Sequence, residues 1–246
     1  MAASSSDSSL PSDFLCGSAP GMTKQTIDFS ALNLPEYRHC YAVLIDGAFT
    51  AAECQDLICA AEATSNGEWE PAMVNVGGGR QRAIPDVRDC GRIIWDDRDI
   101  MGRVWDRVKD QVPEIHRLEF PPRQSRGGFA LGKEVWNATR LNERMRFLKY
   151  TDGQYFKPHQ DGTYLTPDGT ERSYYTLHLY LNESKGLKGG ATEFFSRRWT
   201  PEYKVEPKVG RVLIFQHRDL LHSGEDVESG TKYTMRTDLM FRKEES

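Results

Sequence analysis

The sequence predicts a mainly β fold, an antiparallel sandwich or barrel, with two helices packed against one face of a sheet. From residue 145 onward, short runs rich in β-branched and aromatic residues alternate with glycine-containing turns, which is typical of antiparallel β domains. Before that point, two segments have apolar residues at the spacing of amphipathic helices. The length of 246 residues suits one large domain or two small ones.

We divide the chain into three parts. Residues 1–26 are rich in serine and lack a basic segment followed by an apolar one, so they predict a disordered tail and no secretory signal. Residues 27–135 are expected to form a helical support region, and residues 136–246 the β domain. Five cysteines without a CxxC pair favour reduced thiols, and we therefore expect a cytoplasmic or nuclear protein.

The support region should contain one strand and two helices. Residues 41–45 are a short apolar run that predicts a strand. Thr50 and Glu53 form a capping box, so a helix should begin there and end near Asn66. A second helix is expected over residues 99–112, with several apolar side chains on one side.

Two segments rich in glycine and arginine, residues 76–92 and 121–133, predict loops that cover the mouth of the β domain as a substrate lid. Arg80, Arg82 and Arg88 would then face that mouth. The alternative is that these arginines are ordinary solvated loop charges.

The β domain should contain five strand-like runs: MRFLKY, YYTLHLYLN, ATEFF, GRVLIF and KYTMRTDLMF. A formal net charge of −4 argues against binding nucleic acid through bulk electrostatics. The absence of an apolar run of about 18 residues argues against a membrane-spanning helix. The expected partner is a small-molecule or peptide substrate, and the sequence predicts no particular oligomeric state.

Two of the six histidines begin an H-x-[DE] pattern, His159 with Asp161 and His217 with Asp219. At this content of acidic residues, about one such match is expected by chance. The pattern alone therefore does not identify a metal site, and the predicted structure around each match must be considered. Because alternate residues of an extended segment share a face, His159 and Asp161 can converge on one ion. His222, expected at a strand edge on the far side of the barrel, can complete a two-histidine, one-carboxylate triad, which leaves three positions open on Fe(II).

Two alternatives to this triad remain. His217, Asp219 and His222 lie within six residues and could form a compact zinc-binding loop. The histidines could also serve structural hydrogen bonding.

The ordered combination of NERMRFLKYTDGQYFKPHQDG, YTLHLYLN, GGATEFF and VGRVLIFQHRDLLHSGEDVESGTKYTMRTDLMF resembles the catalytic domain of the prolyl 4-hydroxylase-like Fe(II)/2-oxoglutarate-dependent dioxygenases, over about residues 140–242. The resemblance implies a double-stranded β-helix, or jelly-roll, core. It implies Fe(II), 2-oxoglutarate and O₂ as cofactor and co-substrates, with ascorbate as a further candidate. It also implies His159, Asp161 and His222 as iron ligands and catalytic residues.

The resemblance further assigns residues that bind 2-oxoglutarate. Lys232, ten positions after His222, occupies the family's position for the basic residue that binds the 5-carboxylate. Tyr150 and Tyr180 match positions whose hydroxyl groups contact the co-substrate in relatives. For each tyrosine the alternative is an ordinary core or rim aromatic.

Strand alternation adds two cofactor-pocket candidates. Arg236 should share a face with Lys232, and inside a barrel it needs an anion: Asp238, 2-oxoglutarate or an acidic substrate. His178 should share a face with Tyr180 and lie close to the pocket, as a hydrogen-bonding group or a substrate contact. A core histidine is the alternative.

The resemblance implies hydroxylation of an unactivated C–H bond with decarboxylation of 2-oxoglutarate to succinate. Asp161 favours hydroxylation, because halogenating relatives lack this carboxylate. Peptidyl proline, a free amino acid and a biosynthetic intermediate all remain open as substrates. Two alternatives from other classes are a cupin-type metal-binding jelly roll with non-oxygenase chemistry and a non-catalytic sensor or binding module.

Overall fold

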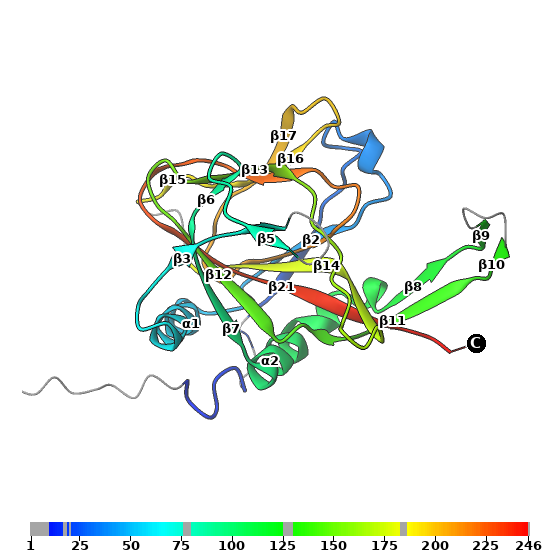
Figure 1. Cartoon of the computed structure of the whole chain (residues 1–246), viewed down its shortest axis with the longest axis horizontal. Helices are drawn as coiled ribbons and strands as arrows, with labels where there is room; N and C mark the ends of the chain where they lie inside the picture. Colours follow the sequence, from blue (N-terminus) through cyan, green and yellow to red (C-terminus); the bar gives the residue numbers. More distant parts are fainter. Residues whose placement is uncertain are drawn as a thin grey trace, which may run out of the picture.

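The computed structural model describes residues 10–16, 19, 21–75, 80–124, 130–182 and 186–245. Within these residues, two antiparallel sheets lie one above the other (Figure 1). This is a mainly β fold with a jelly-roll core, as the sequence and its resemblance predict. None of the helices described is long and apolar enough to cross a lipid bilayer.

The larger sheet has ten strands among the described residues. Its main path runs in the order β1 (Thr23–Thr26), β2 (Ala42–Asp46), β18 (Val212–Gln216), β14 (Glu171–Tyr180), β21 (Lys232–Lys243), β12 (Arg144–Tyr150), β7 (Gly91–Asp96) and β3 (Glu70–Pro71). Off this path, β11 (Glu134–Leu141) pairs with both β21 and β8 (Arg117–Phe120).

The smaller sheet has the order β17 (Pro201–Val205), β16 (Thr192–Phe195), β19 (His222–Gly224), β13 (Tyr155–His159) and β6 (Arg88–Asp89). Three two-stranded pairs complete the described strands: β4 (Val74–Asn75) with β5 (Gln81–Arg82), β9 (Arg123–Gln124) with β10 (Ala130–Leu131), and β15 (Lys188–Gly189) with β20 (Val227–Ser229).

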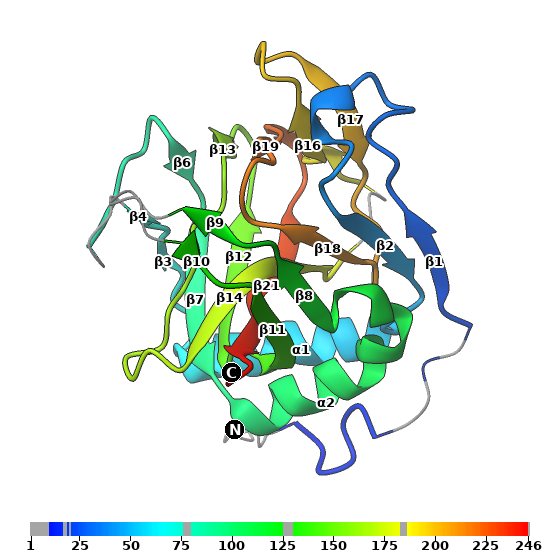
Figure 2. The same ribbon diagram turned by 90° about the vertical axis from the view of Figure 1, so that its right-hand side faces the viewer.

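Helices α1 (Ala51–Thr64) and α2 (Arg98–Val108) cover the same face of the larger sheet (Figure 2). The predicted capping box at the start of α1 is confirmed, since the Glu53 amide donates to Thr50 Oγ1 and the Thr50 amide donates to the Glu53 carboxylate. Asp97 caps α2 by accepting from the Ile100 amide. The second predicted helix is correctly located, although a 3₁₀ turn replaces α-helix after Val108.

Apolar side chains fill both faces of the larger sheet. On the helix side, a core forms from residues such as Ile45, Leu57 and Val104. Between the two sheets, a second core contains Phe194 and Phe215. Central strands covered on both faces explain why the sequence shows nearly continuous apolar runs.

The structure differs from the predicted division at two places. Residues 23–26, assigned to a disordered tail, form β1 and pair with β2, and Phe14 and Leu15 are buried in the core. The side chains of β1 are all exposed, so its backbone pairing left no apolar pattern to recognise. The support region, predicted to contain one strand, also contributes β7 and β8 besides β2 to the larger sheet.

The two predicted loops are only partly loops. Residues 80–92 contain β5, β6 and the beginning of β7, and residues 121–124 and 130–133 contain β9 and β10. Residues 76–79 and 125–129 lie outside the described residues, as do residues 1–9, 17, 18 and 20 of the predicted tail.

Candidate active site

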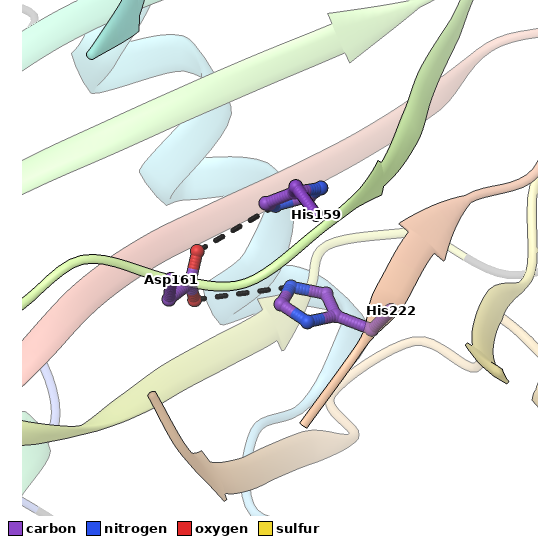
Figure 3. A group of neighbouring side chains, drawn as sticks. All are labelled: His159, Asp161 and His222. Carbon is purple, nitrogen blue, oxygen red and sulfur yellow. Dashed lines mark ion pairs between the residues drawn. The ribbon is translucent and has the colours of Figure 1, made fainter. Parts of the chain in front are cut away.

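Strand pairing in the smaller sheet brings three candidate metal ligands together. His159 ends β13 and stands opposite His222, the first residue of β19, while Asp161 follows β13 by two residues. One ligand atom from each residue lies within 4.8 Å of the other two (Figure 3). The Nε2 atoms of His159 and His222 lie 3.6 Å and 3.9 Å from the two carboxylate oxygens of Asp161.

The position of His222 differs from the sequence prediction. It does not lie on the far side of the barrel from His159 but is its direct cross-strand neighbour. The prediction failed because strand pairing is not local: more than sixty residues separate the two histidines, and no pattern within either segment specifies its partner. A register irregularity between Phe156 and His159 locally bends β13 next to the site.

Both imidazoles are held in the tautomer that suits a metal. His159 Nδ1 lies 2.9 Å from the Lys157 carbonyl oxygen, and His222 Nδ1 lies 3.1 Å from the Leu220 carbonyl oxygen. A carbonyl oxygen can only accept, so each Nδ1 carries the proton and donates it. Each Nε2 is therefore left with its lone pair, and Figure 3 shows both rings beside the Asp161 carboxylate.

The charge states also suit a divalent metal. Burial lowers the pKa of His222 to about 3, so this imidazole is neutral at physiological pH. Burial alone would raise the pKa of Asp161. The positive charge of Arg236 and the hydrogen bond from His159 outweigh this effect, so the pKa of Asp161 lies well below the usual value. A neutral imidazole and an ionised carboxylate are the forms that bind metal.

Two residues of the larger sheet orient the Asp161 carboxylate. Thr176 Oγ1 donates to Asp161 Oδ2 at 2.6 Å, and Arg236 Nη2 lies 3.0 Å from the same oxygen. Arg236 thus points into the barrel, as alternation predicts, and the anion beside it is Asp161, with Asp238 at 3.7 Å. The Asp161 carboxylate is therefore held in place from the side of the larger sheet.

A cavity next to the three ligands extends towards Lys232. Its lining consists of Arg88, Leu148, Tyr150, Phe156, His159, Asp161, His178, Thr192, Phe215, His222, Ser223, Gly224, Lys232 and Arg236. Lys232 is only 2% exposed, and burial lowers its pKa to about 8. No described carboxylate lies within ion-pair distance of its ammonium group.

The other predicted cofactor-binding residues surround Lys232 in different ways. The Tyr150 ring centroid lies 5.2 Å from Lys232 Nζ, and Tyr150 lines the cavity. Tyr180 lies 5.9 Å from the same atom, but its hydroxyl is engaged with Thr192 Oγ1 at 2.7 Å. His178 lines the cavity, burial holds its pKa well below the usual value, and its buried Nε2 has no hydrogen-bond partner among the described residues.

These features fit a metal-chelating dicarboxylate. Three candidate metal ligands and a buried ammonium group without an acidic partner in the described chain line the same cavity. The unpartnered His178 Nε2 adds a polar group that a polar ligand can satisfy. An apolar ligand would leave both the ammonium and the imidazole unpaired.

The alternative zinc loop does not form among the described residues. His217 Nε2 lies 3.5 Å from Asp238 Oδ1, and its Nδ1 lies 3.4 Å from Ser173 Oγ. The group of potential metal ligands includes neither His217 nor Asp219. His217 is a buried residue that hydrogen-bonds within the larger sheet.

Sequence reasoning missed two residues of the site. Thr176 was available from the same alternation that placed His178, because the two share a face of β14, but its bond to Asp161 has no sequence signal. Arg88 was predicted, together with Arg80 and Arg82, to face the mouth of the β domain, and no role at the site distinguished it from them. The structure leaves Arg80 and Arg82 exposed, whereas Arg88 is buried on β6 and lines the cavity.

Known proteins support the same assignment. Residues 145–237 match the family model of the 2OG-Fe(II) oxygenase superfamily. A prolyl hydroxylase from Trichoplax adhaerens, solved with a peptide fragment of the hypoxia inducible factor oxygen degradation domain, has a TM-score of 0.55 and 14% identity, covering 86% of this chain and 90% of its own. A prolyl-4-hydroxylase from Pseudomonas putida has a TM-score of 0.50 and 15% identity, covering 95% and 97%. No curated protein matches the chain in sequence.

At these identities the two structures show a shared fold, and the family match supplies the chemistry. That match spans the segment carrying His159, Asp161, His222 and Lys232. The chain therefore has the fold of the prolyl hydroxylases, and its residues 145–237 are similar to the 2OG-Fe(II) oxygenase superfamily, whose enzymes use Fe(II), 2-oxoglutarate and O₂. The group formed by His159, Asp161 and His222 fits the iron site of such enzymes.

Proposed function

We propose that this enzyme is a hydroxylase that inserts one atom of O₂ into an unactivated C–H bond of its substrate and the other into succinate. The balanced reaction converts 2-oxoglutarate, O₂ and R–H into succinate, CO₂ and R–OH. The observation that carries this proposal is the convergence of His159, Asp161 and His222 beside a cavity that the buried Lys232 also lines.

In this proposal, His159, Asp161 and His222 hold Fe(II), each through one atom. The bound ion supplies the O₂ activation that no protein side chain provides. Two histidines and one carboxylate leave positions open for the keto acid and for O₂. Thr176 and Arg236 hold the Asp161 carboxylate in place, so the ligand set requires little rearrangement on binding.

Lys232 would bind the outer carboxylate of 2-oxoglutarate. A buried ammonium group is costly unless it is paired, and the described part of the chain offers it no acid. A dicarboxylate whose inner end binds the metal supplies that acid at its other end. Tyr150, next to Lys232, and His178, with its unpartnered Nε2, would complete the surroundings of the co-substrate.

The C–H bond to be hydroxylated belongs to a peptidyl proline, a free amino acid or another small molecule. The fold shared with prolyl hydroxylases makes a proline ring the first substrate to test. Cupin-type chemistry without 2-oxoglutarate would leave the buried Lys232 without a function, and so the hydroxylase is preferred.

The test is succinate formation. Protein supplied with Fe(II), 2-oxoglutarate and O₂ should release succinate, and Asp161→Asn should release none above background. Asp219→Asn is the matched control, because it alters the carboxylate of the second H-x-D pattern, which lies outside the ligand group. Equal succinate release by wild type and Asp161→Asn would contradict the proposal.

A further inference from the structure

The cavity beside the metal ligands holds more positive than negative charge. Among its described lining residues, Arg88, Lys232 and Arg236 are cationic and only Asp161 is anionic. Arg236 is paired with Asp161 at 3.0 Å, and the proposed function gives Lys232 the outer carboxylate of 2-oxoglutarate. Arg88 is left without an anion, since no described carboxylate lies within 4.0 Å of its guanidinium group.

Arg88 has contacts, but none of them carries a carboxylate. It stands opposite Phe156 in the β6–β13 pair, and its guanidinium carbon lies 4.4 Å from the Phe156 ring centroid. Its Nε donates to Cys90 Sγ at 3.4 Å, and it also hydrogen-bonds the Tyr150 side chain. The Phe156 ring in turn stacks on His159, with centroids 3.6 Å apart, so a single ring separates Arg88 from a metal ligand.

Burial makes this arrangement unfavourable in the absence of a ligand. Arg88 is 8% exposed, and a guanidinium group stays protonated even when buried. An aromatic face and a thiol are weak partners for a buried cation. A carboxylate would satisfy it far better, because two oxygens match the planar fork of the guanidinium group.

With Fe(II) and 2-oxoglutarate bound, the residues that line the cavity would still carry more positive than negative charge. The two negative charges of 2-oxoglutarate cancel the two positive charges of Fe(II), and Asp161 cancels Arg236. Arg88 and Lys232 then leave the loaded cavity with a surplus of two positive charges. A neutral prolyl side chain would not reduce this surplus, whereas an acidic substrate would.

We infer that the primary substrate carries a carboxylate group, which Arg88 binds while the substrate's hydrocarbon part packs on Phe156. This inference rests on the proposed function and specifies its substrate class: a small carboxylic acid, such as an amino acid or an acylated amino acid. Leu148 and Phe215 also line the cavity and supply apolar surface for the hydrocarbon part.

The test compares acids with their amides. N-acetyl-L-proline, N-acetyl-L-leucine and hexanoic acid, each beside its carboxamide, are added to wild-type protein with Fe(II), 2-oxoglutarate and O₂. Succinate release above the substrate-free rate is measured as a function of probe concentration. At least one acid should half-saturate at a concentration about tenfold to a hundredfold lower than its amide, the range that one charge-assisted hydrogen bond supports.

Variants at Arg88 then test whether this residue causes the preference for the acid over its amide. Arg88→Gln should reduce the advantage of the acid to within about twofold, whereas Arg88→Lys should retain part of it. Arg82→Gln, an exposed arginine of the same segment, should keep the full advantage. If Arg88→Gln fails to fold, the comparison of acids with amides in wild type still decides.

Two results would overturn the inference, and a third would reject the proposed function on which it rests. One is a wild type in which no acid outperforms its amide, whether both respond or neither does. Another is an Arg88→Gln variant that weakens 2-oxoglutarate binding as strongly as Lys232→Gln, which would place Arg88 in the co-substrate site. The last is a wild type that forms no visible charge-transfer band with Fe(II) and 2-oxoglutarate without O₂, and this result would instead reject the proposed function itself.

Discussion

The two ends of the cavity differ in how their charges are satisfied. At the metal end, Asp161 is surrounded by two imidazoles, a hydroxyl and a guanidinium group, all supplied by the chain. At the far end, Lys232 is buried without an acidic partner among the described residues, and Arg88, separated from His159 by the Phe156 ring, has none either. One end is assembled in advance, and the other is completed only by its ligands. Burying these unpaired cations lowers the stability of the free protein. When anionic ligands pair with them, this cost is removed and contributes to the free energy of binding.

Removing a metal ligand should give the largest effect. His159→Ala or His222→Ala should lower the rate of succinate formation by more than about a hundredfold, because loss of a ligand exceeds the 10–100-fold typical of residues that only orient one. Succinate release and bound iron, measured together, check this. If both variants kept their turnover, the metal end would lie elsewhere.

Removing the ammonium group tests the far end. Lys232→Ala should raise the half-saturating concentration of 2-oxoglutarate by about tenfold to a hundredfold, since it deletes a charge-assisted contact. Its affinity for the metal alone should change little, because Lys232 does not contact the ligands. Lys188→Ala, a change on the exposed strand β15, is the control. Unchanged co-substrate affinity would show that Lys232 does not bind the outer carboxylate.

Raising the pH should weaken the binding of 2-oxoglutarate at Lys232. Burial lowers the pKa of Lys232 to about 8, so the free enzyme loses this positive charge as the pH rises through that value. Binding of 2-oxoglutarate should therefore weaken about tenfold between pH 7 and pH 9, as measured by calorimetry. Lys232→Arg keeps its charge over this range and should show a flat profile. A wild-type profile equally flat would show that Lys232 is not the partner.

The smallest effect should come from removing the hydroxyl group that orients the Asp161 carboxylate. Thr176→Val removes the hydroxyl that donates to Asp161 while keeping a similar shape, and Arg236 remains beside the same oxygen. Iron affinity should fall by several-fold to about tenfold. Thr170→Val, on an exposed turn, should leave it unchanged. A loss as large as that of His222→Ala would mean that Thr176 supports the fold itself.

Features of the site that depend on local chain geometry were more predictable from the sequence than features that depend on which strands pair. Alternation placed Lys232 and Arg236 on one face, and the H-x-D spacing brought His159 and Asp161 together, because both are local properties of extended chain. The pairing of β13 with β19 and of β6 with β13 is not local, so neither the true neighbour of His222 nor the burial of Arg88 could be predicted. The polar strand β1 was missed because it pairs only through its backbone and buries no side chain.

The most direct test of the whole account is an anaerobic titration with Fe(II) and 2-oxoglutarate, because it examines the metal, the co-substrate and the open coordination positions together. Wild-type protein should develop a visible metal-to-ligand charge-transfer band that saturates with 2-oxoglutarate, and His222→Ala should develop none. A wild type that stays colourless with both components in excess, or a band of equal strength in the variant, would contradict the assignment of His159, Asp161 and His222 as the iron site.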